Sequence, residues 1–163
     1  MAKEIKLSRG LVAIVDDDMF DYLNQWKWYA YPHRNTFYAR RNRGKLEIGK
    51  AQEIMHVKIV SPGDGNQIDH VNGNGLDNRR ENLRECTHTE NMRNRKIHKN
   101  NTSGYKGVYK RKNRSGWFSM ISIDGVMKYL GQYADASEAA KAYDKAALEY
   151  FGEFAKTNFC ETP

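Results

Sequence analysis

IDHVNGNGLDNRRENLRECTHTENMRN, residues 68–94, is the most informative stretch of this chain. It is crowded with Asp, Asn, His and Gly, and it contains few large apolar side chains. Asn, Asp and Gly are turn-forming residues, so the composition alone is typical of a polar loop. The spacing of its titratable residues indicates a second possibility.

Several residues of this stretch fit the roles that hydrolysis of a phosphodiester requires: a base for water and oxygen ligands for a cation. His70 is the natural base, because the pKa of an imidazole lies near neutral. Asp69 offers a hard oxygen ligand for Mg²⁺, and Asn91 can add an amide oxygen. Asn82 either orients the imidazole or fixes the loop. From these residues alone, the polar loop and the hydrolytic site are equally open.

The same stretch resembles the ββα-metal active site of HNH nucleases, in the variant found in phage and intron-encoded homing endonucleases. The resemblance covers residues 55–95 well and the N-terminal region loosely. The matching motifs are the Asp-His pair at 69–70, NGN at 72–74, LDNRRENLR at 76–84 and ENMRN at 90–94.

The resemblance implies His70 as general base, Asp69 and Asn91 as metal ligands, and Asn82 as the central asparagine. Many family members have histidine where this chain has Asn91, so this is an H-N-N version in which His88 is the alternative ligand. The implied cofactor is one Mg²⁺ or Mn²⁺ ion per active site. The implied reaction leaves a 5′-phosphate and a 3′-hydroxyl. With one site per chain, a monomer on DNA would make a nick.

Residues 105–159 resemble a second family, the DNA-binding domain of plant ethylene-response factors, in which a three-stranded sheet lies in the major groove. The matching segments include YKGV at 105–108, GW at 116–117, YLG at 129–131 and AYD at 142–144. The resemblance places these residues on the DNA-facing sheet: Lys106, Tyr109, Arg111, Met120, Ser122, Met127 and Tyr129.

The charge of the chain favours a polyanionic partner. It has 27 Lys and Arg against 20 Asp and Glu, a formal charge of +7 and a pI near 9.4. Such a balance suits double-stranded DNA, although solvated lysines also produce it. Residues 91–116 contain no acid, and we expect Arg93 and Arg95 to follow the DNA backbone there.

We expect an α+β protein with two domains. A nuclease domain over 1–98 would be β-rich and would hold the ββα-metal motif at about 67–95; a linker at 99–104 would lead to a DNA-binding domain over 105–163. In that domain, Asp124-Gly125 predicts a hairpin turn, and a three-stranded antiparallel sheet would pack on one helix. Locally, residues 51–60 predict a helix with Ile54, Met55 and Ile59 inward, on which His56 would be structural.

Other classes are disfavoured. No apolar run is long enough to span a membrane, and the N-terminus lacks the features of a secretory signal. Two cysteines cannot form a disulfide framework or a four-cysteine zinc site, so we expect a reducing cytoplasm. The resemblance to phage and intron-encoded nucleases implies that this is a bacterial cytoplasm and that the gene belongs to a phage or mobile element. Two alternatives stay open: a non-catalytic DNA-binding regulator with a vestigial nuclease segment, and an RNA-binding module.

Overall fold

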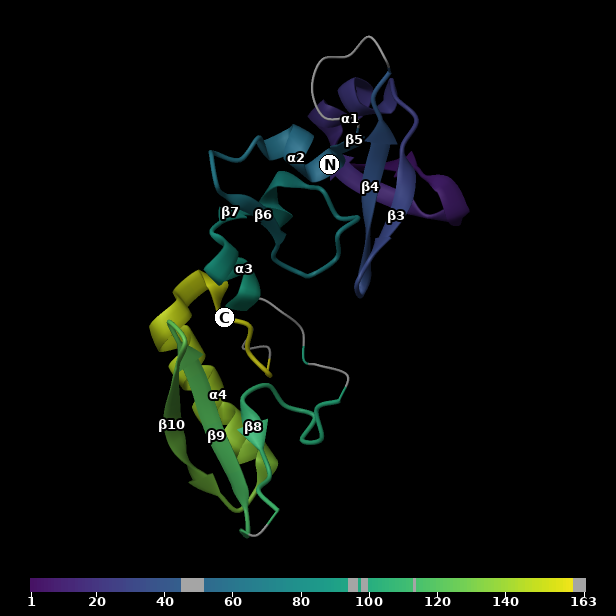
Figure 1. Ribbon diagram of the computed structural model, residues 1–163. Helices are drawn as coiled ribbons and strands as arrows, with labels where there is room; N and C mark the ends of the chain where they lie inside the picture. The colour runs from purple at the N-terminus through teal and green to yellow at the C-terminus, as the bar shows by residue number, and fades with distance from the viewer. Residues whose placement is uncertain (45–51, 94–96, 98–99, 113, 160–163) are drawn as a thin grey trace. The chain divides into compact units, whose positions relative to one another are not determined.

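The protein is described by a computed structural model over residues 1–44, 52–93, 97, 100–112 and 114–159. It divides into two compact units, Met1–Asn91 and Met92–Pro163, which we describe separately (Figure 1). The expectation of mixed helices and strands is confirmed, because small antiparallel sheets alternate with few helices. The predicted domain bounds, with a linker at 99–104, stay a prediction.

The first unit contains three small sheets. Each pairs strands that are antiparallel neighbours, in the orders β1-β2, β3-β4-β5 and β6-β7. The strands are β1 (Ala2–Lys6), β2 (Val12–Asp16), β3 (Tyr29–His33), β4 (Thr36–Asn42), β5 (Gln52–Ile54), β6 (Gln67–His70) and β7 (Leu83–Cys86). The helices are α1 (Asp17–Asn24), α2 (Met55–Val60) and the first residues of α3 (His88–Arg93), with short 3₁₀ turns at Ser8–Gly10 and Arg80–Asn82.

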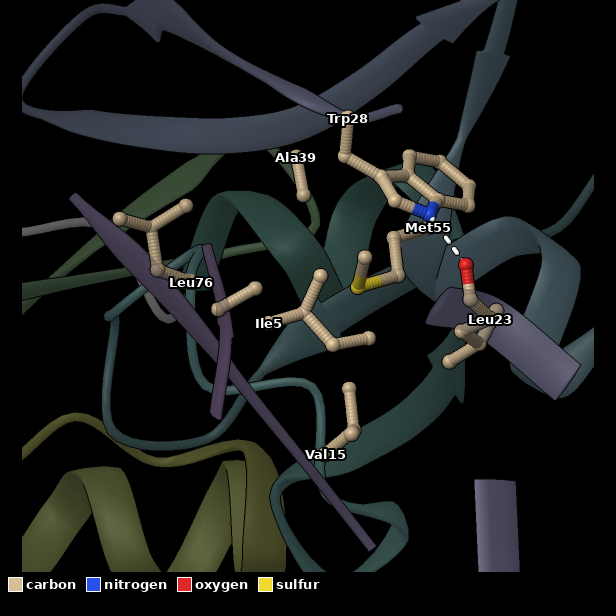
Figure 2. Close-up of a cluster of buried hydrophobic side chains, with 8 residues drawn as sticks. Ile5, Val15, Leu23, Trp28, Ala39, Met55 and Leu76 are labelled. Atoms are coloured by element: carbon tan, nitrogen blue, oxygen red, sulfur yellow. Dashed lines mark hydrogen bonds between the residues drawn. The ribbon is translucent and has the colours of Figure 1, made fainter. Parts of the chain in front are cut away.

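An apolar cluster joins the first two sheets, α1, α2 and the loop after β6 (Figure 2). Its buried members come from β1, β2, α1, the connection before β3, β4, α2 and the loop after β6: Ile5, Ala13, Val15, Leu23, Trp28, Ala39, Met55 and Leu76. The Trp28 indole nitrogen donates to the carbonyl of Leu23 at 2.8 Å, so the polar end of this large side chain is satisfied inside the core.

The polar loop after β6 is anchored to this core by backbone hydrogen bonds. Ile14 of β2 donates its amide to the carbonyl of Leu76 at 2.8 Å, and its carbonyl accepts from the amide of Asn78 at 2.7 Å. With Leu76 buried in the cluster, a stretch with a turn-like composition therefore has a fixed position in the fold.

The helix predicted over 51–60 is wrong in its first half. Residues 52–54 form β5, which pairs with β4, and the helix begins at Met55. Pairing with residues of β4 that lie ten to fourteen positions earlier satisfies this backbone, and no periodicity within the segment signals it. Residue 51 lies outside the described residues.

The second unit is a three-stranded antiparallel sheet covered on one face by a helix. Its strands are β8 (Val108–Tyr109), β9 (Trp117–Ile123) and β10 (Val126–Tyr133), in the order β10-β9-β8. Asp124 and Gly125 both have positive φ, as the predicted hairpin turn requires. Asp135 caps α4 (Ala136–Phe151) by accepting from the Ser137 amide at 2.6 Å.

The helix packs on the sheet through its small residues. Ala139 and Ala140 lie against Val108, while Tyr143 and Ala147 surround Ile121. Tyr150 of α4 is 37% exposed, and its hydroxyl accepts from the ammonium of Lys128. In the part of the chain that is described, no helix is both long and apolar enough to cross a bilayer.

Gly107 offers a test of this packing. It has φ +76°, and a Cβ there would collide with the ring of Tyr143 on α4. Gly104 has φ +75° and open space around it, so Gly104→Ala measures the backbone cost alone, about 1–2 kcal/mol. We expect Gly107→Ala to destabilise the unit by a further 1–3 kcal/mol, roughly the cost of overpacking. Hydrogen exchange of α4 amides in the full chain measures both, and equal protection in the two variants contradicts this packing.

Candidate active site

β6 and β7 form the frame of the candidate site. They pair antiparallel, with Gln67 opposite Cys86 and His70 opposite Leu83. The loop that joins them contains the turn-forming residues of the sequence motif, and α3 follows β7 directly. Asp69 and His70, the Asp-His pair, are both buried at the end of β6.

Two aromatic rings surround the imidazole of His70. The ring of Tyr38 stacks on it with centroids 5.7 Å apart and planes 22° apart. The ring of His56 meets it edge-on at 4.9 Å and 87°. The His70 Nε2 lies 3.5 Å from the Asn78 Oδ1, a long contact. These neighbours restrict the plane of the imidazole.

Burial determines the charge of both histidines. It lowers the pKa of His70, and it lowers the pKa of His56 to about 3, with a smaller contribution from His70 itself. His70 is therefore neutral at neutral pH, which is the form that can accept a proton. His56 is structural in the sense predicted, because it lies in the protein interior, but its ring contacts the candidate base.

Asp69 is held by an arginine on the neighbouring strand. Its Oδ2 accepts from the Nε and the terminal nitrogen of Arg84 at 3.0 and 2.8 Å. The two residues are direct cross-strand partners. This ion pair is largely shielded from solvent, and it fixes the direction of the carboxylate.

The candidate ligands on α3 meet β6 through Gln67. The Asn91 amide nitrogen donates to the Gln67 Oε1 at 2.6 Å, and the His88 Nδ1 lies 3.4 Å from the Gln67 Nε2. Gln67 and Asp69 are two residues apart on a strand, so their side chains share one face. The structure thus brings Asp69, Asn91 and His88 to the same side of β6. The Asn91 side chain contacts Gln67 through its amide nitrogen, and the amide oxygen is the atom that can bind a metal.

This donor set fits a hard divalent cation. One carboxylate with amide oxygens suits Mg²⁺, which usually keeps several waters and also binds substrate phosphate. Within the described residues, no group of three or more His, Cys, Asp or Glu gathers as it does in an all-protein metal cage.

Asn82 fixes the loop through both ends of its side-chain amide. Its Oδ1 accepts from the amide of Asn72 at 3.0 Å, and its Nδ2 donates to the carbonyl of Asp77 at 2.8 Å. Of the two roles that the sequence left open for Asn82, fixing the loop is supported by these two hydrogen bonds, and orienting the imidazole stays a prediction. The Asn78 side-chain oxygen lies beside the His70 imidazole.

Asp77 continues this network. Its carboxylate accepts from Arg79 at 2.8 Å through each oxygen and from the Asn72 side chain at 2.9 Å. The Arg79 guanidinium holds the pKa of Asp77 below its usual range, so the carboxylate stays charged and the loop stays cross-linked at neutral pH.

The predicted DNA-binding residues divide into three groups. Tyr109, Arg111, Ser122 and Tyr129 lie on the sheet face away from α4, as shown below. Lys106 instead turns its ammonium to the carbonyl of Arg93, and burial lowers its pKa to about 8. The Arg93 guanidinium lies over the ring of Phe151 and pairs with Asp124 at 3.3 Å. Arg95 lies outside the described residues.

Sequence reasoning did not identify several residues of the site. Tyr38, Asn78 and Arg84 contact the Asp-His pair from β4, the loop and β7. Arg84 could have been predicted, because pairing the two strands of the motif places it beside Asp69. Tyr38 carried no local signal.

Comparisons with known proteins agree with this geometry. The family described as HNH endonuclease matches residues 61–93. An uncharacterized HNH endonuclease of Acanthamoeba polyphaga mimivirus is 27% identical over 150 residues, which cover 92% of this chain and 76% of that protein. Protein 3.8 of Escherichia phage T7 is 34% identical over 92 residues, 56% of this chain and 75% of that protein.

A third similarity concerns the C-terminal part. An AP2-like ethylene-responsive transcription factor of Arabidopsis thaliana is 46% identical over 59 residues, 35% of this chain and 17% of that protein. Together these comparisons confirm the predicted resemblance and indicate a nuclease. The chain belongs to the HNH endonuclease family.

The buried histidine beside His70 generates a prediction about acid stability. The pKa of His56 is about 3 in the folded protein and about 6.5 when unfolded, so below pH 6.5 only the unfolded state takes up this proton. Between pH 6.5 and 5, we expect the wild type to lose about 2 kcal/mol more stability than His56→Phe, at about 1.4 kcal/mol per pH unit. Urea unfolding at both pH values measures this, and parallel losses in the two proteins contradict a buried neutral His56.

Proposed function

We propose that this protein is a metal-dependent DNA endonuclease that nicks one strand at preferred sites, as homing enzymes do. In this proposal β6, β7 and α3 form the ββα-metal motif. One observation carries it: a neutral, buried His70 neighbours Asp69, which shares a side of β6 with Asn91. These are the base and oxygen ligands that phosphodiester hydrolysis requires.

Each residue of the chain has a distinct part in the proposed mechanism. His70 accepts a proton from the attacking water while Tyr38 and His56 keep its ring in plane. Arg84 keeps the Asp69 carboxylate directed, and Asn82 holds the loop in place. Asp69 and Asn91 would hold Mg²⁺ or Mn²⁺, which neutralises charge on the phosphate and on the departing 3′ oxygen when bound.

DNA affinity is assigned to the second unit. Residues 92–163 contain 13 Lys and Arg against 7 Asp and Glu, a net charge of +6; residues 1–91 contain 14 against 13, a net charge of +1. The charge that attracts phosphate is therefore concentrated in the part of the chain that resembles transcription factors.

The Asp69–Arg84 ion pair favours a second candidate, a DNA-binding regulator with a vestigial nuclease segment. Arg84 engages one oxygen of the carboxylate that would bind the metal. The two candidates differ in a single property, cleavage of DNA that depends on a divalent ion.

Nicking of supercoiled plasmid distinguishes them. We expect the full chain to convert supercoiled plasmid to open circles with Mg²⁺ and not with EDTA. His70→Ala should lower the rate by about 10²–10⁴-fold, the usual contribution of a general base, while DNA binding persists. Equal nicking by His70→Ala removes His70 from its role, and binding without cleavage in every metal favours the regulator.

Asn91→Ala and His88→Ala test the ligand assignment as a matched pair. Both side chains contact Gln67, so both changes remove one contact from the same place. We expect Asn91→Ala to raise the Mg²⁺ concentration that gives half-maximal nicking by tenfold or more, as loss of a ligand does, and His88→Ala to leave it unchanged. The reverse order assigns the metal to His88.

Binding should depend steeply on salt. If the second unit neutralises about six phosphates, DNA affinity falls by about 10³-fold between 50 and 200 mM salt, because counterions are released on binding. Fluorescence anisotropy with a labelled duplex in EDTA measures this slope for the full chain. A flat response over that range contradicts electrostatic binding.

A further inference from the structure

One face of the sheet in the second unit is left uncovered by α4. Ile121 points from β9 into the core formed with Tyr143 of α4. Because side chains alternate along a strand, Phe118, Met120 and Ser122 point to the opposite face. The Arg111 guanidinium lies over the Phe118 ring at 4.8 Å, which places it on that face as well.

The strand register adds side chains from β8 and β10, since directly paired residues share a face. The pairs are Tyr129 with Met120, Met127 with Ser122, and Tyr109 with Phe118. We call this surface the open face; it consists of Tyr109, Met120, Ser122, Met127 and Tyr129, which surround the buried Phe118. Tyr109, Met127 and Tyr129 are 48%, 49% and 54% exposed.

This surface is unusually poor in cations for a basic unit. Among the described residues, the contact with the Phe118 ring places one cation on this face, that of Arg111. Lys128 turns towards Tyr150 on the helix side, and the Lys106 ammonium donates to the carbonyl of Arg93. Guanine is read in the major groove mainly by Arg or Lys on its O6 and N7 atoms. The open face therefore offers little for reading guanine.

We propose that the open face reads thymine in the major groove through its C5-methyl group, so that this endonuclease prefers A·T-rich sites. The inference rests on the proposed DNA-binding function. Apolar side chains are the partners of the thymine methyl, and the groove admits β-strands. The tyrosine hydroxyls can donate to the thymine O4 or the adenine N7.

Charge identifies DNA as the occupant of this exposed apolar surface. The unit carries a net charge of +6. Exposed Lys112 and Arg114 lie in the connection between β8 and β9, at one end of the open face, where they can meet phosphates on the rim of a groove. An apolar protein partner would gain nothing from this rim.

Uracil substitution isolates the methyl group. The full chain is used in EDTA, which permits binding without cleavage, to select duplexes from a random pool. The enriched duplexes are then made with deoxythymidine or with deoxyuridine, which differ only by the methyl. We expect A·T-rich selections and about fourfold weaker binding for each contacted methyl that is removed, roughly the value of one buried CH₂, or on the order of tenfold for two.

Variants connect this effect to the open face. Met127→Ser should reduce the difference between the two duplexes, and Tyr109→Ser should do the same from the other edge of the sheet. Val126→Ser is the control, because Val126 is 70% exposed and adjacent but pairs with Ile123 on the helix side. Circular dichroism verifies that each variant is folded.

Three results would overturn the proposal. Equal affinity for both duplexes removes methyl reading while leaving DNA binding intact. Self-association that Met127→Ser abolishes, with DNA affinity unchanged, makes the open face a contact between copies of the chain. Absence of DNA binding at low salt rejects the proposed function itself, and the inference with it.

Discussion

The candidate site depends on two hydrogen bonds between Ile14 of β2 and the loop after β6. They hold the backbone at Leu76 and Asn78, and Leu76 carries this attachment into the apolar core. Asn78 is fully buried beside His70, and Asn82 reaches back to Asp77 in the same loop. Without this anchor, a segment so rich in Asn, Asp and Gly would have many conformations, because those residues favour turns of several kinds. The core thus provides the order that the local sequence lacks.

The same architecture carries an energetic cost. His56 and His70 are polar groups in the protein interior, and the Nδ1 of His56 has no hydrogen-bond partner among the described residues. A buried polar atom without a partner costs about 1–3 kcal/mol. Tyr38 and His56 offset part of this through ring contacts, which also restrict the His70 imidazole. We interpret the cost as the consequence of keeping a base neutral and oriented.

The sequence predicts the parts of this protein that local patterns determine. The Asp-His pair and the hairpin turn at Asp124-Gly125 each have a signal within a few residues, and each is found. The contacts of Tyr38 with His70 and the pairing of β5 with β4 are different, because they join residues far apart in the chain. Spacing within a segment contains no information about them. This is why the prediction of a helix over 51–60 was wrong in its first half. It is also why His56 was predicted as structural without its contact with the His70 ring.

The distribution of charge over the two units places the attraction for DNA and the candidate hydrolytic site in different parts of the chain. A unit with a net charge of +1 attracts DNA weakly, whereas a unit of +6 attracts it strongly at any sequence. If the catalytic unit bound phosphate tightly by itself, it would engage DNA wherever it met it, and preferred sites would have little influence on cleavage. In the proposed function, affinity lies in a separate unit, and the sequence that this unit holds would determine which phosphate stays near His70 long enough to react. Site preference would then be a property of residence time on DNA more than of the hydrolytic step.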